Sequence, residues 1–168
     1  MKRRTLLKLG AVSAAILIVA GGASVLIEPG LHQGRLSPAA RQMFASVARA
    51  ILDGTLPAEP KASQAALEAM LHRLEGLAQA LPPHVQTELS QLISLLCLGA
   101  GRRLLAGLST DWPHASVLEV QQALQAMRMS RLAPRQQIYH GLHDIVGAAY
   151  FSGSSTWGAM GYPGPVTI

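Results

Sequence analysis

The chain has 168 residues, 49% of them hydrophobic and 14% charged, which fits one ordinary domain with a buried core and excludes a disordered chain. Four residues, Lys2, Arg3, Arg4 and Lys8, account for nearly all of the formal net charge of +5, because the remaining residues carry 10 basic against 9 acidic side chains. The nearly neutral body has no basic stripe interleaved with aromatic residues, so nucleic acid is not expected as a partner.

Residues 1–30 have the layout of an export signal. A basic cluster precedes an uncharged run from Leu9 to Ile27, and the run stops at Glu28-Pro29. The start of the chain resembles the twin-arginine translocation motif, with Lys2 where Ser or Thr is usual; the matching residues are Arg3, Arg4, Leu6, Leu7 and Lys8. The leader is either removed near the small residues 21–24 or retained as an inner-membrane anchor. Both alternatives place the body in the periplasm.

Residues 31–150 are predicted to form an all-α bundle of about five helices. The first begins at Ser37-Pro38 and stops at Asp53-Gly54, because a side-chain cap and a proline favour a helix start and glycine a helix end. The second is expected to be capped by Ser63 and to end at Pro82-Pro83. The third starts at Pro83 and becomes apolar on nearly all sides, which predicts the central helix of the domain.

The second half of the body is also predicted to be helical. The stretch GAGRRL at 99–104 indicates a helix interruption, with Arg102 and Arg103 solvated or paired with acids of a partner. Ser116 and Glu119 have the spacing of a capping box. A last helix opens at Pro134, and the residues on its apolar face are Ile138, Leu142, Ile145, Val146 and Ala149.

The body carries no catalytic, cofactor or metal motif, and no such site is predicted in this chain. His140, His143 and Asp144 fall opposite the apolar face of the last helix, where polar residues need no metal. Cys97, the single cysteine, is expected to be a small buried hydrophobe rather than a reactive thiol.

Residues 151–168 are predicted to form an irregular C-terminal tail. Glycines and prolines prevent a continuous helix there, while large amphipathic rings suit docking on a partner. The alternative is that the tail folds back as a cover over its own bundle. The docking candidates are Tyr150, Phe151, Trp157, Tyr162, Pro163 and Pro165.

Together with the leader, three stretches give the chain a family resemblance: LSPAARQMFASVARAIL at 36–52, MRMSRLAPRQQIYHGL at 127–142 and AYFSGSSTWGAMGYPGP at 149–165. They are similar to sequences of the gluconate 2-dehydrogenase subunit 3 family and of related periplasmic small subunits with twin-arginine leaders. The chain departs from that family at ILDGTLP, residues 51–57, where an Ile-Pro pair is commoner.

The resemblance implies an exported, non-catalytic accessory subunit without a cofactor of its own. Its expected partners are a flavin-dependent dehydrogenase large subunit of the glucose-methanol-choline type, which would hold FAD, a cytochrome c subunit and the twin-arginine translocase. Such a complex would act on sugars, sugar acids or alcohols. A membrane-tethered periplasmic interaction protein unrelated to a dehydrogenase is the alternative.

Overall fold

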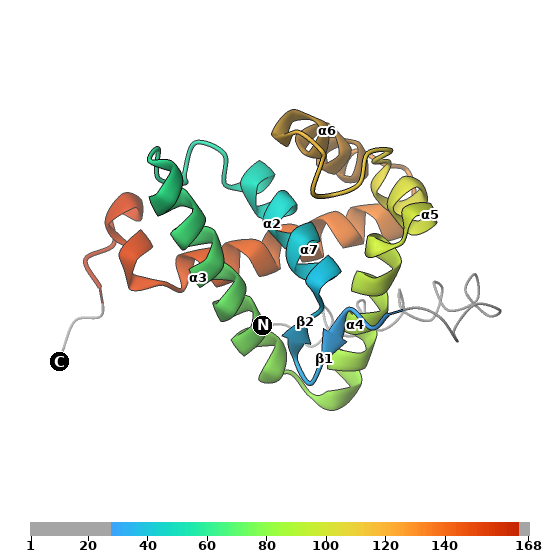
Figure 1. Cartoon of the computed structure of the whole chain (residues 1–168), viewed down its shortest axis with the longest axis horizontal. Helices are drawn as coiled ribbons and strands as arrows, with labels where there is room; N and C mark the ends of the chain where they lie inside the picture. Colours follow the sequence, from blue (N-terminus) through green and yellow to red (C-terminus); the bar gives the residue numbers. More distant parts are fainter. Residues whose placement is uncertain (1–27, 165–168) are drawn as a thin grey trace.

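The computed structural model describes residues 28–164, and this part of the chain is mostly helical, as the sequence predicts (Figure 1). The export-signal residues and Pro165 lie outside the described residues. The elements are β1 (Leu31–His32), β2 (Arg35–Leu36), α2 (Pro38–Ile51), α3 (Pro60–Gln79), α4 (Pro83–Cys97), α5 (Gly99–Gly101), the π-helical turn η1 (Arg102–Ala106), α6 (Val117–Arg128), α7 (Ala133–Phe151), and the 3-10 turns η2 (Ser154–Thr156) and η3 (Gly158–Met160).

Helix α2 is the centre of the bundle, because it packs against α3, α4, α6 and α7. Its Met43, Phe44 and Val47 are at most 1% exposed. The prediction that the helix starting at Pro83 is central was wrong. Only three residues of α4 are buried, namely Ile93, Ser94 and Leu96, because its apolar residues spread over more than one face and only one face meets the core.

Several helix ends follow the predicted capping chemistry. The Ser37 hydroxyl accepts from the Ala40 N–H at 3.2 Å, and the capping box of Ser116 and Glu119 is present. Helix α3, however, begins at Pro60 rather than at Ser63, because the Glu59 carboxylate accepts from the Ala62 N–H at 2.6 Å. A carboxylate at this position also interacts favourably with the positive end of the helix dipole.

A two-stranded hairpin precedes α2 and was not predicted. Leu31 pairs with Leu36 and His32 with Arg35, and the turn between them uses Gln33 and Gly34, both with positive φ. Two short strands with one turn are not stable alone. Tertiary contacts must therefore hold this hairpin in place.

Two serines of α4 supply those contacts. The Ser94 hydroxyl accepts from the Gly30 N–H at 2.8 Å and lies 3.0 Å from the Glu28 carbonyl oxygen. The Ser90 hydroxyl accepts from the Leu31 N–H at 2.9 Å. These bonds pair backbone groups that would otherwise have no partner within the hairpin. Residues 28–31, the first that the structure describes, are therefore hydrogen-bonded to α4.

The helix interruption after α4 is confirmed, but the expected state of Arg102 was wrong. The axis bends by 82° between α4 and the segment Gly99–Ala106. Arg102 is 8% exposed rather than solvated, and its guanidinium donates to the carbonyl oxygens of Leu108 and Ser109 at 3.3 and 3.2 Å. The bend turns this side chain inward, where it closes the loop that follows η1. Arg103 is exposed.

Among residues 28–164 no single helix is both long and apolar enough for a membrane span. The bent pair Pro83–Cys97 and Gly99–Ala106 has sufficient length and apolarity only when both halves are taken together.

Replacing Gly30 with alanine is expected to destabilise the fold, because a Cβ there would lie 2.5 Å from Ile93 Cγ2 and 2.8 Å from the Ser90 carbonyl oxygen. We expect a loss of about 1–3 kcal/mol in the free energy of unfolding, measured by urea denaturation. The matched control is Gly141→Ala, since nothing lies within 4 Å of a Cβ at that position in α7. That variant should gain about 0.5–1 kcal/mol. Equal effects in both variants would contradict the tight docking of the hairpin on α4.

Candidate docking surface

The C-terminal segment after α7 forms a compact hook, defined as residues 152–164. Its two short turns, η2 and η3, follow α7 directly, and η2 contacts that helix. Figure 1 shows the hook at one end of the long axis of the described body, with α5 towards the other end. The hook carries three of the six predicted docking candidates, Trp157, Tyr162 and Pro163, so their individual surroundings decide what it can bind.

Tyr150 is not a surface residue, and its prediction as a docking candidate was wrong. It is 4% exposed, belongs to the hydrophobic core, and its hydroxyl donates to the Thr55 carbonyl oxygen at 3.3 Å. Helix α7 continues to Phe151, and Tyr150 lies one turn beyond Val146 on the buried face. The helical register therefore places this ring in the core rather than in the tail.

Phe151 and Trp157 are half-buried and give the hook its internal structure. The indole N–H of Trp157 donates to the Phe151 carbonyl oxygen at 3.2 Å. The Trp157 ring meets Tyr162 edge to face, with 5.3 Å between ring centroids. The buried Thr156 hydroxyl donates to the Gly153 carbonyl oxygen at 2.7 Å. The hook is thus ordered by its own hydrogen bonds and ring contacts.

Arg73 of α3 joins the hook to the bundle. Its Nε donates to the Ala149 carbonyl oxygen at 2.6 Å and its Nη2 to that of Tyr150 at 3.3 Å. The last carbonyl groups of a helix lack intrahelical partners, and a cation there also suits the helix dipole. Gly153 lies against the same guanidinium, where a Cβ would be 2.8 Å from Cζ. The sequence pattern did not indicate this role, since Arg73 occurs within an ordinary amphipathic helix.

Three exposed residues with large apolar side chains define what we call the hook tip: Met160, Tyr162 and Pro163. Met160 and Tyr162 are each 47% exposed, and Pro163 is exposed as well. Aromatic residues and methionine are enriched at protein–protein interfaces and provide a large contact area at low entropic cost. Of the predicted candidates, Tyr162 and Pro163 are thus available for docking from the described chain.

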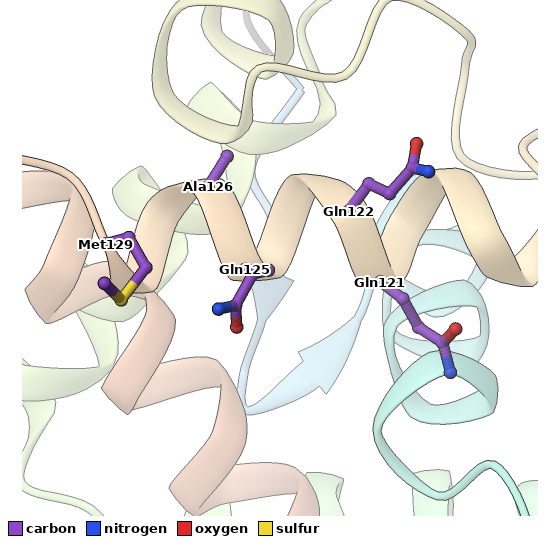
Figure 2. Close-up of a pocket in the computed structure, with 5 residues that line it drawn as sticks. All are labelled: Gln121, Gln122, Gln125, Ala126 and Met129. Carbon is purple, nitrogen blue, oxygen red and sulfur yellow. The ribbon is translucent and has the colours of Figure 1, made fainter.

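The surface of α6 is hollowed but is not a catalytic pocket. An open hollow of about 480 Å³ is lined by four residues of α6, Gln121, Gln122, Gln125 and Ala126, and by Met129 directly after it. In Figure 2, Gln122 and Ala126 point to one side of the helix, while Gln121, Gln125 and Met129 point to the other. Amide groups that diverge from a single helix do not enclose a substrate.

A smaller hollow of about 210 Å³ lies among α2, α6 and α7 and includes Ile51, Tyr139 and His143 in its lining. His140, His143 and Asp144 are exposed, as predicted for the polar face of α7. His143 Nδ1 lies 3.6 Å from Asp144 Oδ1, with the two side chains 54% and 81% exposed. Within residues 28–164 no group of three or more His, Cys, Asp or Glu side chains is arranged to hold a metal ion.

Two carboxylates with lowered pKa values have structural explanations. The hydrogen bond with His114, at 2.8 Å, lowers the pKa of Asp111. The backbone N–H and the hydroxyl of Ser116 lower the pKa of Glu119 within the capping box. Both carboxylates hold turns at the start of α6, and neither shift points to a reacting group.

Cys97 is a half-buried free thiol beside the first described residue. Burial and the negative charge of Glu28 raise its pKa from the usual value of 9.0 to about 11. Both effects favour the neutral thiol, which agrees with the predicted role of a small hydrophobe.

Alkylation of Cys97 by iodoacetamide should therefore be slow in the folded protein. At about pH 8 its thiolate fraction is on the order of 100-fold lower than that of a thiol with a pKa of 9.0. The rate should rise with pH until the pH reaches the raised pKa, and unfolding in urea should restore ordinary reactivity. Mass spectrometry would follow the product, and rapid alkylation of the native chain would contradict this assignment.

Comparison of the chain with known protein families, with curated proteins and with solved structures found no significant match.

Proposed function

We propose that this chain is an exported, non-catalytic accessory subunit that binds a periplasmic flavin-dependent dehydrogenase and helps to carry it across the inner membrane. The dehydrogenase would hold FAD and act on sugars, sugar acids or alcohols, with a cytochrome c subunit as a further partner. The proposal depends on the presence of two features in the same chain: an export-type leader and an exposed, ordered docking surface. A leader with the Arg3-Arg4 pair precedes the body, and an ordered hook with an exposed tip of Met160, Tyr162 and Pro163 ends its described part.

The leader supports the export step of the proposal. The twin-arginine route carries proteins that have already folded, and a flavoprotein that loads FAD in the cytoplasm must cross the membrane folded. Arg3 and Arg4 precede an uncharged run of about nineteen residues, which fits an export signal. A subunit with this signal could serve a partner that has none.

The hook supports the binding step of the proposal. Its backbone is held by the Trp157 and Thr156 hydrogen bonds and by contact with Arg73, so little conformational entropy remains to be lost on binding. The exposed ring of Tyr162 packs edge to face against the ring of Trp157. A preorganised aromatic surface of this kind suits a protein partner better than a small substrate.

Replacing Arg3 and Arg4 with lysine should retain both this chain and its flavoprotein in the cytoplasm. The two genes are co-expressed in the native host, and flavin fluorescence and dehydrogenase activity are measured in periplasmic and cytoplasmic fractions. The matched control is Lys2→Gln, which removes a nearby charge but keeps the arginine pair. If flavin-loaded dehydrogenase still reaches the periplasm with the lysine variant, this chain does not carry it.

Truncating the hook tip should weaken partner binding without loss of stability. We expect Tyr162→Ala with Met160→Ala to raise the Kd for the flavoprotein at least about tenfold, because exposed aromatic anchors dominate interface energetics. The melting temperature should stay within about 2 °C, since surface substitutions have small effects on stability. The control is Leu77→Ala, which removes an apolar side chain of similar exposure, 40%, from α3. Unchanged affinity in the hook variant, or an equal loss in the control, would exclude the tip as the binding surface.

A membrane-tethered interaction protein without a dehydrogenase is the second candidate, favoured by the uncharged run from Leu9 to Ile27. Purification of the tagged chain from membranes with no flavin attached would select this candidate over the first.

A further inference from the structure

A second exposed surface lies towards the end of the body that is opposite the hook. We call it the leucine–arginine patch, and its residues are Leu98, Arg103, Leu104, Arg128, Met129, Arg131 and Leu132. Its apolar members are conspicuously exposed: Leu104 at 70%, Met129 at 69% and Leu132 at 62%. Figure 1 shows α5 and the beginning of α7 together on this side, at a distance from the hook along the long axis.

The parts of the patch are held together by a contact between η1 and the start of α7. Arg135 Nε donates to the Leu105 carbonyl oxygen at 2.9 Å, and the Arg135 N–H donates to the Leu132 carbonyl oxygen at 3.0 Å. These bonds bring Leu104 and Leu132, which neighbour the bonded groups in sequence, to the same region of the surface. Met129 follows the last turn of α6, and α6 also contacts η1.

The charge of the described body is concentrated in the same segment. Residues 98–135 contain five arginines and two acids, whereas the rest of the described chain contains five basic and seven acidic residues. Both acids of the segment are already engaged, Asp111 with His114 and Glu119 with Ser116. Within the described chain, Arg103, Arg128 and Arg131 are exposed and form no ion pair. The patch therefore presents uncompensated positive charge between exposed leucines.

The first described residue, Glu28, lies near the point where this patch begins. The Glu28 carbonyl oxygen lies 3.0 Å from the Ser94 hydroxyl, and the Glu28 carboxylate acts on the Cys97 thiol. Leu98, the first residue of the patch, follows Cys97 directly. Glu28 therefore lies close to the end of α4 from which the patch continues. A membrane segment that ended just before Glu28 would bring the patch close to the bilayer surface.

From this combination we infer that the leucine–arginine patch binds the surface of an anionic phospholipid membrane and orients the body with its hook pointing away. Arginines attract anionic headgroups, and the adjacent leucine and methionine side chains can enter the boundary between headgroups and acyl chains. The patch has no tyrosine, tryptophan or phenylalanine, the residues that anchor protein interfaces, whereas the hook has two aromatic side chains, Trp157 and Tyr162. The inference does not depend on which partner binds the hook.

Depth-dependent fluorescence quenching with the full-length chain tests this orientation. Cys97→Ser provides a cysteine-free background, since Cys97 is the only cysteine. A single cysteine replaces Leu104 or Leu132 in the patch, or Met160 in the hook, and carries an environment-sensitive label. Vesicles of phosphatidylethanolamine with phosphatidylglycerol, containing spin-labelled lipid, should quench the label at 104 and at 132 but not at 160. Equal quenching at all three positions would show attachment through the leader alone and overturn the inference.

A comparison of anionic with zwitterionic vesicles separates the contribution of the arginines to binding from that of the apolar residues. Replacing Arg103, Arg128 and Arg131 with glutamine should reduce the preference for phosphatidylglycerol over phosphatidylcholine vesicles to the part that Lys2, Arg3, Arg4 and Lys8 supply, with affinity falling about fivefold for each arginine replaced. Arg49→Gln, at an exposed position of α2 outside the patch, should leave the preference unchanged. If the triple variant keeps full preference, the patch does not recognise anionic lipid.

A second experiment tests whether a protein, rather than lipid, covers the leucine–arginine patch. Iodide in the water should quench the label at 104 in the absence of vesicles, both with and without the purified flavoprotein. If the flavoprotein protects this position, the patch belongs to a protein interface, and the inference is wrong. Circular dichroism melting curves of each labelled variant establish that the bundle is folded throughout.

Discussion

Two hydroxyl groups on α4 hold the start of the described chain, because Ser90 and Ser94 provide the partners that the backbone of residues 28–31 lacks within its own short hairpin. Gly30 permits this approach, since any side chain there would meet Ile93. The hairpin in turn positions Ser37, the cap of the central helix α2. The placement of residues 28–31 on the bundle therefore depends on a contact between Gly30 and one face of α4.

The two exposed surfaces differ in chemistry as well as in place. The hook tip offers an aromatic ring on a backbone that is already ordered, and the leucine–arginine patch offers aliphatic side chains among cations. Protein partners favour the former and lipid headgroups the latter. A body with one surface of each kind could hold a partner at a defined orientation to a membrane, with α7 running between the two ends (Figure 1).

Local signals in the sequence predicted much of the helical architecture, while contacts between distant residues account for what was missed. Ser37 and the capping box of Ser116 with Glu119 were found because a cap depends on residues three positions apart. The hairpin was missed because its stability comes from serines about sixty residues away. Tyr150 was assigned to the docking site because of its aromatic neighbours in sequence, although its spacing from Val146 already placed it on the buried face. Arg102 looked like a solvated charge, and only the bend after α4 turns it inward.

Arg73 makes the hook a conformational epitope rather than a linear one. Its guanidinium binds the end of α7 from α3 and lies against Gly153, where a Cβ would displace it. The direction in which the hook leaves the bundle is thus set by the packing of two helices that are far apart in sequence. An unfolded or partly folded chain contains the same residues but not the same surface. A protein that recognises the hook in this arrangement can therefore bind only after the bundle has folded.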